Sequence, residues 1–407
     1  MIYDNNTGGI ATMSTRWLKR IAAALALCTA LTSFTACSGS DTQSGTAEGT
    51  AEGTAQATEE AEPAAKLGFI YKGSVDGGGF TADCNSQRMA AEQYSDVESE
   101  YIENVPVSEF EKAVKLLVED GCTHIVAGSP VYSNVINSVS KNYMNISFIG
   151  YGAGARTVNV YAYTEGVYQA AYVAGMAAAY NSDTEKIGMV VDPSMLYTLQ
   201  SINAAALGTQ IVYSTAGLVT AWAVTDGEIR RAVDALAAKG CDVIISYTES
   251  PEVVNYCSSK GIKVIGNIDY GSNYADYDSM ILYFYSSRDS FFLSQYKAMQ
   301  MGDWETSSYM GTLGNGVLCI SDALSAAKDG TQDIINALVP KVASGAAPIF
   351  MGQLKDISDS IRLREGAVMS TSDVLAMDWY VLGVDNSLDS FIESKATFEE
   401  VPLEIKH

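Results

Sequence analysis

The chain of 407 residues carries 25 Lys and Arg against 48 Asp and Glu, a formal net charge of −23 at pH 7. This length suffices for two ordinary domains, and this charge argues against a polyanionic partner such as nucleic acid. The sequence holds two histidines, His124 within an apolar segment and His407 at the last position. We therefore expect neither a His/Cys metal site nor Ser-His-Asp catalysis, and we expect no cofactor.

Residues 1–36 have the layout of a secretory signal peptide. Arg16, Lys19 and Arg20 precede the apolar run IAAALALCTALTSF, and small residues follow it. This run is too short to span a membrane comfortably, and its order of basic, apolar and small residues is typical of a cleaved signal. Because a cysteine comes directly after Thr-Ala, we expect Cys37 to become a lipidated first residue. The alternative is an ordinary signal with Cys37 merely nearby.

Residues 37–65 have the composition of a disordered tether. They contain repeated GTAE units and no bulky apolar residue, so they cannot bury enough surface to offset chain entropy. A lipid on Cys37 would then hold the following domain on the outer face of the cytoplasmic membrane. Removing residues 1–36 takes away three basic residues and one acid, which leaves 22 Lys and Arg against 47 Asp and Glu, or −25.

From residue 66 onward, short apolar segments alternate with segments of helical spacing. Two examples of the helical kind are SEFEKAVKLLVEDG at 108–121 and DGEIRRAVDALAAKG at 226–240. This alternation predicts an α/β fold whose parallel sheets are covered on both faces. The expected strands include KLGFIY (66–71), THIVAGS (123–129), ISFIGYG (146–152), IGMVVD (187–192), DVIISYT (242–248) and KVIGNID (263–269).

The two halves of this region share one pattern. FEKAVKLLVEDGCTHIVAGSP is followed by NISFIGYG, and IRRAVDALAAKGCDVIISYTESP is followed by GIKVIGNID. Two similar Rossmann-like lobes are the simplest account, and chance recurrence of a common α/β pattern is the alternative. Because open parallel sheets bind ligands beyond the carboxyl ends of their strands, two facing lobes joined by a hinge would enclose a ligand cleft.

We expect the chain to cross between the lobes near residues 162, 275 and 320. Lobe 1 would comprise 66–162 with 276–320 returning to it, and lobe 2 would comprise 163–275 with 321–385 returning to it. Residues 386–407 would form a C-terminal extension whose role the sequence does not indicate.

The loop GSVDGGGF at 73–80 is unsuited to phosphate. It lacks the GxxxxGK[ST] and GxGxxG patterns, and the carboxylate of Asp76 would repel a phosphate. An aromatic face at Phe80 and a carboxylate at Asp76 suit a planar neutral ligand with hydrogen-bond donors. Trp222, in a second-lobe segment, could stack on the other face of the ligand. The alternatives are that Phe80 and Trp222 pack in the core.

Several stretches from residue 66 to about 384 resemble the basic membrane protein family, lipoproteins that bind purine nucleosides or related purines for ABC importers. They are DGGGFT followed by Arg88, YIENVP, GVYQAAYVAGMAAA, IGMVV, SINAAALG, a tryptophan followed by Glu228, GCDVIISYTESPEVV and MDWYVLGV. The resemblance implies a type I periplasmic-binding-protein fold with two hinged lobes. It also implies permease and ATPase subunits as partners, with no catalytic group, and we expect a monomer.

The resemblance further implies that Phe80 and Trp222 stack on a purine nucleoside or base. Asp76 and Asp269 would accept hydrogen bonds from the base or from a ribose. The expected ligand-binding residues are Asp76, Phe80, Thr81, Asn85, Ser129, Trp222 and Asp269.

The chain departs from the family at three places. Cys84 stands where close relatives carry a histidine, a glutamate is missing near Tyr197, and an aromatic residue is missing near Arg288. Such a pocket could prefer a different purine or another flat polar ligand. Two other functions stay open, namely a lipid-anchored sensor of a small ligand such as a sugar, and a secreted nucleoside hydrolase with paired carboxylates.

Overall fold

The computed structural model describes residues 65–95, 97–152, 157–215, 217–267, 278–389 and 402–407. The expected signal peptide, nearly all of the expected tether, Cys37 and Asp269 lie outside these ranges. No helix in the described ranges combines the length and apolar character that crossing a bilayer requires.

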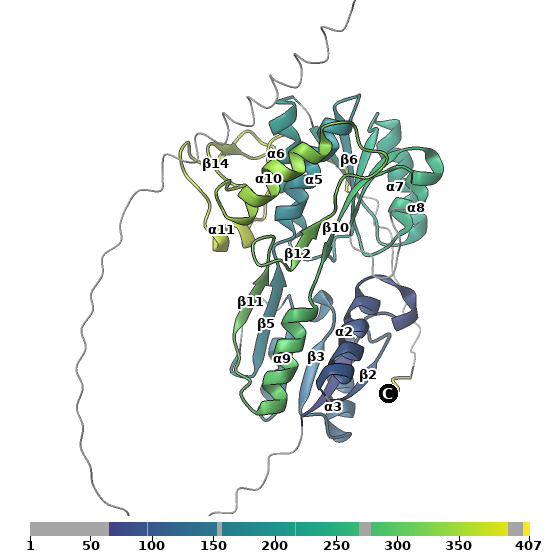
Figure 1. The fold of residues 1–407 in the computed structure, drawn as a ribbon, viewed down its shortest axis with the longest axis vertical. Coiled ribbons are helices and arrows are strands. Elements are labelled where there is room, and N and C mark those ends of the chain that lie inside the picture. The colour runs from purple at the N-terminus through teal and green to yellow at the C-terminus, as the bar shows by residue number, and fades with distance from the viewer. Residues whose placement is uncertain (1–64, 96, 153–156, 216, 268–277, 390–401) are drawn as a thin grey trace, which may run out of the picture. The chain divides into compact units, whose positions relative to one another are not determined.

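The first lobe is built on a six-stranded sheet in which all pairings are parallel (Figure 1). Successive side chains of its central strand point to opposite faces, as a strand requires. Leu67 and Phe69 pack in one core cluster and Ile70 packs in another, so both faces of the sheet are covered. In spatial order the strands are β11 (Ser308–Gly311), β5 (Val160–Glu165), β4 (Ser147–Tyr151), β3 (His124–Ala127), β1 (Lys66–Ile70) and β2 (Glu98–Ile102).

The second lobe repeats this strand order on a seven-stranded sheet. The order β2-β1-β3-β4-β5 of the first sheet corresponds to β7-β6-β8-β9-β10 of the second, which confirms the two similar lobes expected from the sequence. All its pairings are parallel except that between β12 and β10. In spatial order the strands are β12 (Leu318–Ile320), β10 (Met280–Ser286), β9 (Lys263–Asn267), β8 (Val243–Tyr247), β6 (Lys186–Val191), β7 (Gly217–Trp222) and β15 (Val384–Leu388).

Helices cover the faces of both sheets (Figure 1). In α3, the buried residues Phe110, Ala113, Val114 and Leu117 follow the spacing of a single helix face. The helices of the first lobe are α2 (Gly79–Ser95), α3 (Phe110–Glu119), α4 (Ile136–Val139) and α9 (Asp289–Met301). Those of the second are α5 (Tyr168–Asn181), α6 (Thr198–Val212), α7 (Asp226–Ala238), α8 (Glu252–Lys260), α10 (Thr331–Ala343) and α11 (Thr371–Leu375). A two-stranded ribbon pairs β13 (Leu354–Lys355) with β14 (Ile361–Leu363).

Helices α5 and α6 pack closely because both carry glycine at their contact. A Cβ at Gly175 would lie 2.1 Å from the carbonyl oxygen of Ala205, and a Cβ at Gly208 would lie 2.2 Å from that of Tyr172. Neither distance is compatible with any side chain. This pair forms a rigid buried layer under the second sheet, since nearly every residue of α5 is buried.

Strand pairing moves the second crossing between the lobes away from its expected position, and it puts the first and third a few residues from theirs. The chain leaves the first sheet after Glu165, because β5 continues to that residue, and it returns to the first lobe after β10. The expectation that residues 280–286 belong to lobe 1 is corrected, since β10 pairs in parallel with β9 of the second sheet. The third crossing comes between β11 and β12, because β12 pairs with β10 and belongs to the second sheet.

The expected C-terminal extension is divided between the two lobes. Strand β15 reaches Leu388 and pairs with β7, so the second sheet includes the first residues of that extension. At the very end of the chain, Lys406 exchanges backbone hydrogen bonds of 2.8 and 2.9 Å with Tyr101 of β2. The side chains of Leu403 and Ile405 pack against the core of the first lobe. The terminal residues therefore cover the edge of the first sheet.

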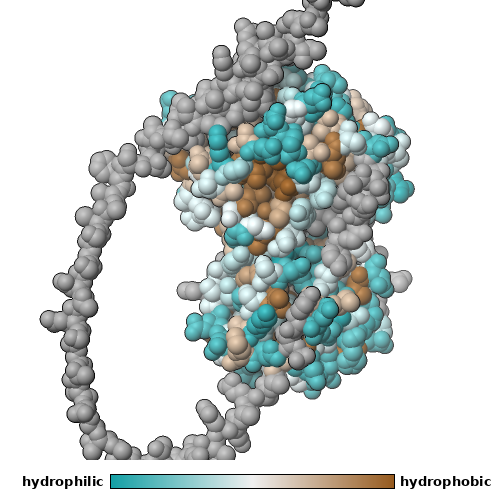
Figure 2. Space-filling view, viewed as in Figure 1, coloured by the Kyte–Doolittle hydropathy of each residue, from teal (hydrophilic) through white to brown (hydrophobic). Residues whose placement is uncertain are grey.

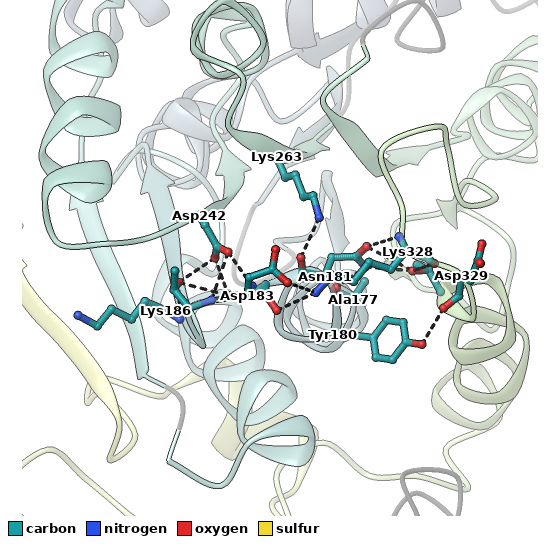
Figure 3. A network of polar contacts seen from close by, with 12 residues as sticks. Ala177, Tyr180, Asn181, Asp183, Lys186, Asp242, Lys263, Lys328 and Asp329 are labelled. Atoms are coloured by element: carbon teal, nitrogen blue, oxygen red, sulfur yellow. Dashed lines mark hydrogen bonds and ion pairs between the residues drawn. The ribbon is translucent and has the colours of Figure 1, made fainter. Parts of the chain in front are cut away.

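A polar network ties the base of the second lobe together (Figure 3). Asn181, fully buried at the end of α5, accepts the backbone N–H of Lys328 at 2.6 Å and donates to the Thr331 hydroxyl at 3.0 Å. Its carbonyl accepts the ammonium of Lys263 at 3.1 Å. Asp242 accepts the hydroxyl of Ser182 at 2.5 Å and backbone or hydroxyl donors of residues 183 and 184. This base network lies at the amino ends of β8 and β9 and anchors the segment that arrives from the third crossing.

The surface differs between the lobes on the face shown in Figure 2. Apolar residues gather over the second lobe there, whereas the described surface of the first lobe is mostly hydrophilic.

Candidate functional site

The carboxyl ends of the strands in both sheets border one cavity of about 30 Å³. This is the position at which open α/β sheets bind ligands. Lobe 1 contributes aromatic residues, and lobe 2 contributes residues at or just after the ends of β6, β8 and β9. Residues at the first two crossings, including Glu165 and Arg288, complete the lining. The lining residues are Phe80, Pro130, Tyr151, Tyr163, Thr164, Glu165, Val167, Met195, Leu196, Tyr247, Glu249, Asn267 and Arg288.

Arg288 is the charged centre of this site. It follows β10 at the second crossing, and its side chain is 1% exposed. Its Nε and Nη2 both donate to the carboxylate of Glu165, the latter at 3.1 Å, and its Nη1 donates to Asp83. The guanidinium carbon lies 4.6 Å from the ring centroid of Phe80, which is a cation–π contact. The planar, always-charged guanidinium group is suited to such burial, because its N–H bonds match the geometry of carboxylate oxygens.

Glu165 links two crossings of the hinge. It ends β5 at the first crossing, and its carboxylate accepts the hydroxyls of Tyr163 and Ser286, each at 2.7 Å. Burial opposes its ionisation, but the charge and hydrogen bonds of Arg288 prevail and lower the pKa of Glu165. For Asp83 the balance is reversed, because burial raises its pKa more than Arg288 lowers it. Glu165, Asp83 and Arg288 form a buried hinge cluster with one more carboxylate than cation.

Two further polar groups of the cavity come from lobe 2. Asn267 ends β9 and is 4% exposed, its Nδ2 donates to the Thr248 carbonyl at 3.4 Å, and its Oδ1 has no partner in the described structure. Glu249 follows β8, and burial raises the pKa of its carboxyl. Among the described residues, burial and more distant charges act on this carboxyl, and no hydrogen bond to it is found.

The glycine-rich loop approaches lobe 2 at this point. A Cβ at Gly79 would lie 2.9 Å from the carbonyl oxygen of Glu249, and the backbone of Gly79 has a φ of 64°. A glycine is needed both for the backbone conformation and for the close approach. The loop therefore brings the first turn of α2, including Phe80, against the strand ends of the other lobe.

The expected site residues fall into two groups. Phe80 lines the cavity, with its ring 5.1 Å from that of Tyr151 in an edge-on arrangement. Ser129 is buried beside the lining residue Pro130 and accepts the N–H of Val131 at 3.4 Å, while Thr81 is buried one residue beyond Phe80.

Asp76, Asn85 and Trp222 do not line the cavity. Asp76 is exposed in a 3₁₀ turn (Val75–Gly77), and Asn85 accepts the Nε–H of Arg88 at 2.9 Å on α2. Trp222 is the last residue of β7 and is not among the residues that line this cavity. The sandwich of a ligand between these two rings stays a prediction.

The sequence reasoning missed Arg288, Glu165 and Asp83. A signal existed for part of the site, because Glu249 directly follows the expected strand DVIISYT and Asn267 lies near the end of the expected strand KVIGNID. No group of three His, Cys, Asp or Glu suited to hold a metal occurs within the described ranges. The described cysteines, Cys84, Cys122, Cys241, Cys257 and Cys319, are all free thiols.

Comparisons with known proteins agree with this arrangement. The family described as ABC transporter substrate-binding protein PnrA-like matches residues 64–280. A purine-binding protein of Brucella abortus is 25% identical over 335 residues, which are 81% of this chain and 95% of that protein. A protein of Haloferax volcanii, provisionally named an ABC transporter glucose-binding protein, is 24% identical over 289 residues, or 70% of this chain and 73% of its own length.

Solved structures share the fold at low identity. A solute-binding protein of an ABC transporter system from Aeropyrum pernix has a TM-score of 0.61 at 14% identity, covering 72% of this chain and 93% of that one. A second from Conexibacter woesei has a TM-score of 0.56 at 17% identity, covering 69% and 97%. These likenesses confirm the type I periplasmic-binding-protein fold. Because the family match spans more than half of the sequence, the chain belongs to the PnrA-like (Bmp) family of ABC transporter substrate-binding proteins.

Proposed function

We propose that this protein captures a purine nucleoside or purine base and passes it unchanged to the permease and ATPase subunits of an ABC importer. The observation that carries the proposal is the cavity between the strand ends of the two lobes, walled by the rings of Phe80, Tyr151, Tyr163 and Tyr247. Aromatic rings supply stacking surface for a planar base. The name of the Brucella abortus relative supports a purine as the ligand.

Capture would require the lobes to move apart. Sites for small organic ligands measure about 300–1,000 Å³, whereas this cavity measures about 30 Å³. Chain crossings after β5, β10 and β11 join the lobes, and hinged closure of such lobes around a ligand is a common motion. Entry of a purine would also require Arg288 to leave the face of Phe80 or the ligand to use the opposite side of the cavity.

The chemistry of the cavity supports binding rather than catalysis. A general acid or base needs a carboxyl group that is free to exchange a proton with the substrate. Glu165 and Asp83 are both committed to Arg288. The hydrolase alternative would therefore depend on Glu249 alone, without the paired carboxylate that such a reaction uses.

Substrate-binding proteins of ABC transporters act outside the cytoplasm, and we propose that this one is a monomer held at the membrane by a lipid on Cys37. Two or three acyl chains hold a protein firmly on a bilayer, whereas one chain does so marginally. The substitution Cys37→Ser should therefore move the protein from the membrane fraction to the soluble fraction of cells. Cys28→Ser, inside the apolar run, is the matched control, and a Cys37→Ser protein that stays with the membranes would contradict lipid anchoring.

A thermal-shift screen of the purified protein tests the ligand class. It would compare purine nucleosides and bases with pyrimidine nucleosides and glucose, and a ligand at one hundred times its Kd adds about 2.7 kcal/mol of stability. We expect purines to stabilise the protein, and we expect Phe80→Ala to abolish the shift while Met301→Ala, at an exposed residue, preserves it.

A sugar is the second candidate ligand, because the Haloferax volcanii relative carries glucose binding in its name. Stabilisation by glucose without any response to purines would overturn the purine proposal and favour this one. A sugar-responsive protein that acts as a sensor would be distinguished by its membrane partner, which would be a signalling protein rather than a permease.

A further inference from the structure

We infer that the cavity selects ligands by the hydrogen bonds they donate, and that Glu249 and Asn267 make it prefer an amino-bearing purine over its 6-oxo counterpart hypoxanthine. This inference rests on the proposed function and assigns a ligand chemistry to the same cavity. It follows from which of the donors and acceptors that line the cavity already have hydrogen-bond partners.

Most donors at the cavity are already committed. Three of the five N–H bonds of the Arg288 guanidinium donate to Glu165 or Asp83. The tyrosine hydroxyls are also occupied, since that of Tyr151 donates to Gln87 at 3.0 Å and that of Tyr247 to the Leu196 carbonyl at 2.5 Å. Tyr163 donates to Glu165 and Thr164 donates to the Tyr197 hydroxyl at 2.6 Å. Among these groups, a ligand that offers acceptors therefore finds only the two remaining N–H bonds of the Arg288 guanidinium.

Two acceptors of the cavity have no partner among the described residues. Asn267 is buried, and its amide nitrogen faces the carbonyl of Thr248, which leaves Oδ1 as the unpaired atom. Glu249 is the next residue after Thr248, and its carboxylate has no hydrogen bond to the described residues. A buried acceptor without a partner is unfavourable, so a ligand that donates to it gains more than a ligand donating to an exposed group.

The two acceptors lie at the ends of neighbouring strands, because β8 and β9 pair in parallel. An exocyclic amino group carries two N–H bonds and can donate to both acceptors at once. Adenine offers this group at its 6-position, and guanine offers an amino group beside a ring N–H. Hypoxanthine offers one ring N–H and places a carbonyl oxygen beside it, and that oxygen would face an acceptor.

The charge of the site agrees with this selection. Glu165 and Asp83 share the single guanidinium of Arg288, and Glu249 adds another carboxyl at the cavity. A phosphate or carboxylate on the ligand would meet like charge in a desolvated place. The preferred ligand is therefore a neutral or cationic amino purine, and a nucleotide is excluded.

Calorimetric titration of the full protein with adenosine, guanosine, inosine and purine riboside tests the inference. Adenosine or guanosine should bind at least ten times more tightly than inosine, and adenosine 5′-phosphate should bind more weakly than adenosine. Purine riboside lacks both the amino and the oxo group, so it should fall near inosine rather than near adenosine.

Two substitutions should remove the discrimination without removing binding. In Glu249→Gln and Asn267→Leu, the affinity ratio of adenosine to inosine should fall toward one, chiefly through weaker adenosine binding. Glu365→Gln, at an exposed position, is the matched control and should keep the wild-type ratio.

Equal wild-type affinities for adenosine, guanosine and inosine would overturn this inference and leave the proposed function standing. Failure of every purine to bind would overturn the proposed function itself. The wild-type ligand series decides the question even where a variant fails to fold, and far-ultraviolet circular dichroism identifies such a variant.

Discussion

Two polar networks lie at opposite ends of the strands in the second lobe, and different groups satisfy them. The hinge cluster at the carboxyl ends consists of side chains that pair with side chains, with charges on Arg288, Glu165 and Asp83. The base network at the amino ends centres on Asn181 and Asp242, whose partners are largely backbone groups and hydroxyls (Figure 3).

This difference indicates that the base network stabilises the lobe, whereas the groups at the carboxyl ends of the strands serve ligand binding. In the base network, Asn181 and Asp242 have their polar atoms satisfied within the protein, so the network needs nothing further and holds the lobe together. At the other end, the hinge cluster has an excess of negative charge, and Asn267 and Glu249 beside it lack partners. Unsatisfied groups of this kind are concentrated where a ligand completes them. The following predictions test this division, from the largest expected effect to the smallest.

The substitution Arg288→Met should give the largest loss of stability. It leaves two buried carboxylates, Glu165 and Asp83, without their cation, and breaking a buried pair from one side costs about 3–5 kcal/mol. Equilibrium unfolding in urea measures this change. Arg230→Met is the matched control, because Arg230 is 56% exposed in its ion pair with Glu252 and should cost less than about 1 kcal/mol.

A second substitution sharpens the interpretation of Arg288. The double variant Arg288→Met with Glu165→Gln removes the unpaired charge at Glu165 and should recover part of the lost stability. If Arg288→Met alone unfolds at the same urea midpoint as wild type, the guanidinium does not stabilise the buried carboxylates. That result would contradict the role given to the hinge cluster.

The substitution Asn181→Leu should cost about 2–3 kcal/mol, since it leaves the partly buried N–H of Lys328 without an acceptor and the hydroxyl of Thr331 with its bond to the Lys328 carbonyl alone. The same urea experiment measures it. Asn336→Leu is the control, because Asn336 is exposed and accepts a single side-chain hydrogen bond. Ligand affinity should be unchanged in Asn181→Leu, and a large loss of affinity would contradict the division between the two ends of the lobe.

Much of the fold could be predicted from the sequence because its signals are local. Alternating apolar strands and amphipathic helices indicated two parallel α/β lobes, and the recurring Gly-Cys turn before β3 and β8 indicated their similarity. Phe80 could be placed near the ligand cleft because it directly follows the first strand and a glycine-rich loop. These inferences require only that strand ends of a parallel sheet lie at one edge.

The remainder depended on contacts between distant residues. Arg288 lies 123 positions from Glu165 and 205 positions from Asp83, and no local pattern reveals that pairing. Trp222 was assigned to the cleft from its place near a strand end, but that place does not determine which neighbours its ring meets. The crossing after β10 was missed because an apolar strand can join either sheet, and the choice is made by its pairing with β9.

The smallest predicted effect concerns Asp242 and depends on pH. Burial opposes its ionisation, but hydrogen bonds from Ser182, Asp183 and Thr184 outweigh burial and lower the pKa of Asp242 below its usual value. Because the folded pKa is lower than the unfolded one, the ionised carboxylate stabilises the fold above the unfolded pKa of about 3.9. This contribution is lost as the pH falls through the folded pKa.

Asp242→Asn should therefore be less stable than wild type by about 1 kcal/mol at pH 7, an amount discounted for its partial exposure. This difference in the free energy of unfolding should narrow below about pH 4, because the unfolded carboxyl then takes up a proton and the folded one does so only at lower pH. Urea unfolding of both proteins at pH 7, 5 and 3.5 measures this difference. If the difference in the free energy of unfolding between the two proteins stays constant over this range, the hydrogen bonds of Asp242 do not depend on its charge. The base network would then stabilise the lobe through geometry alone, and the contrast with the charged hinge cluster would become sharper.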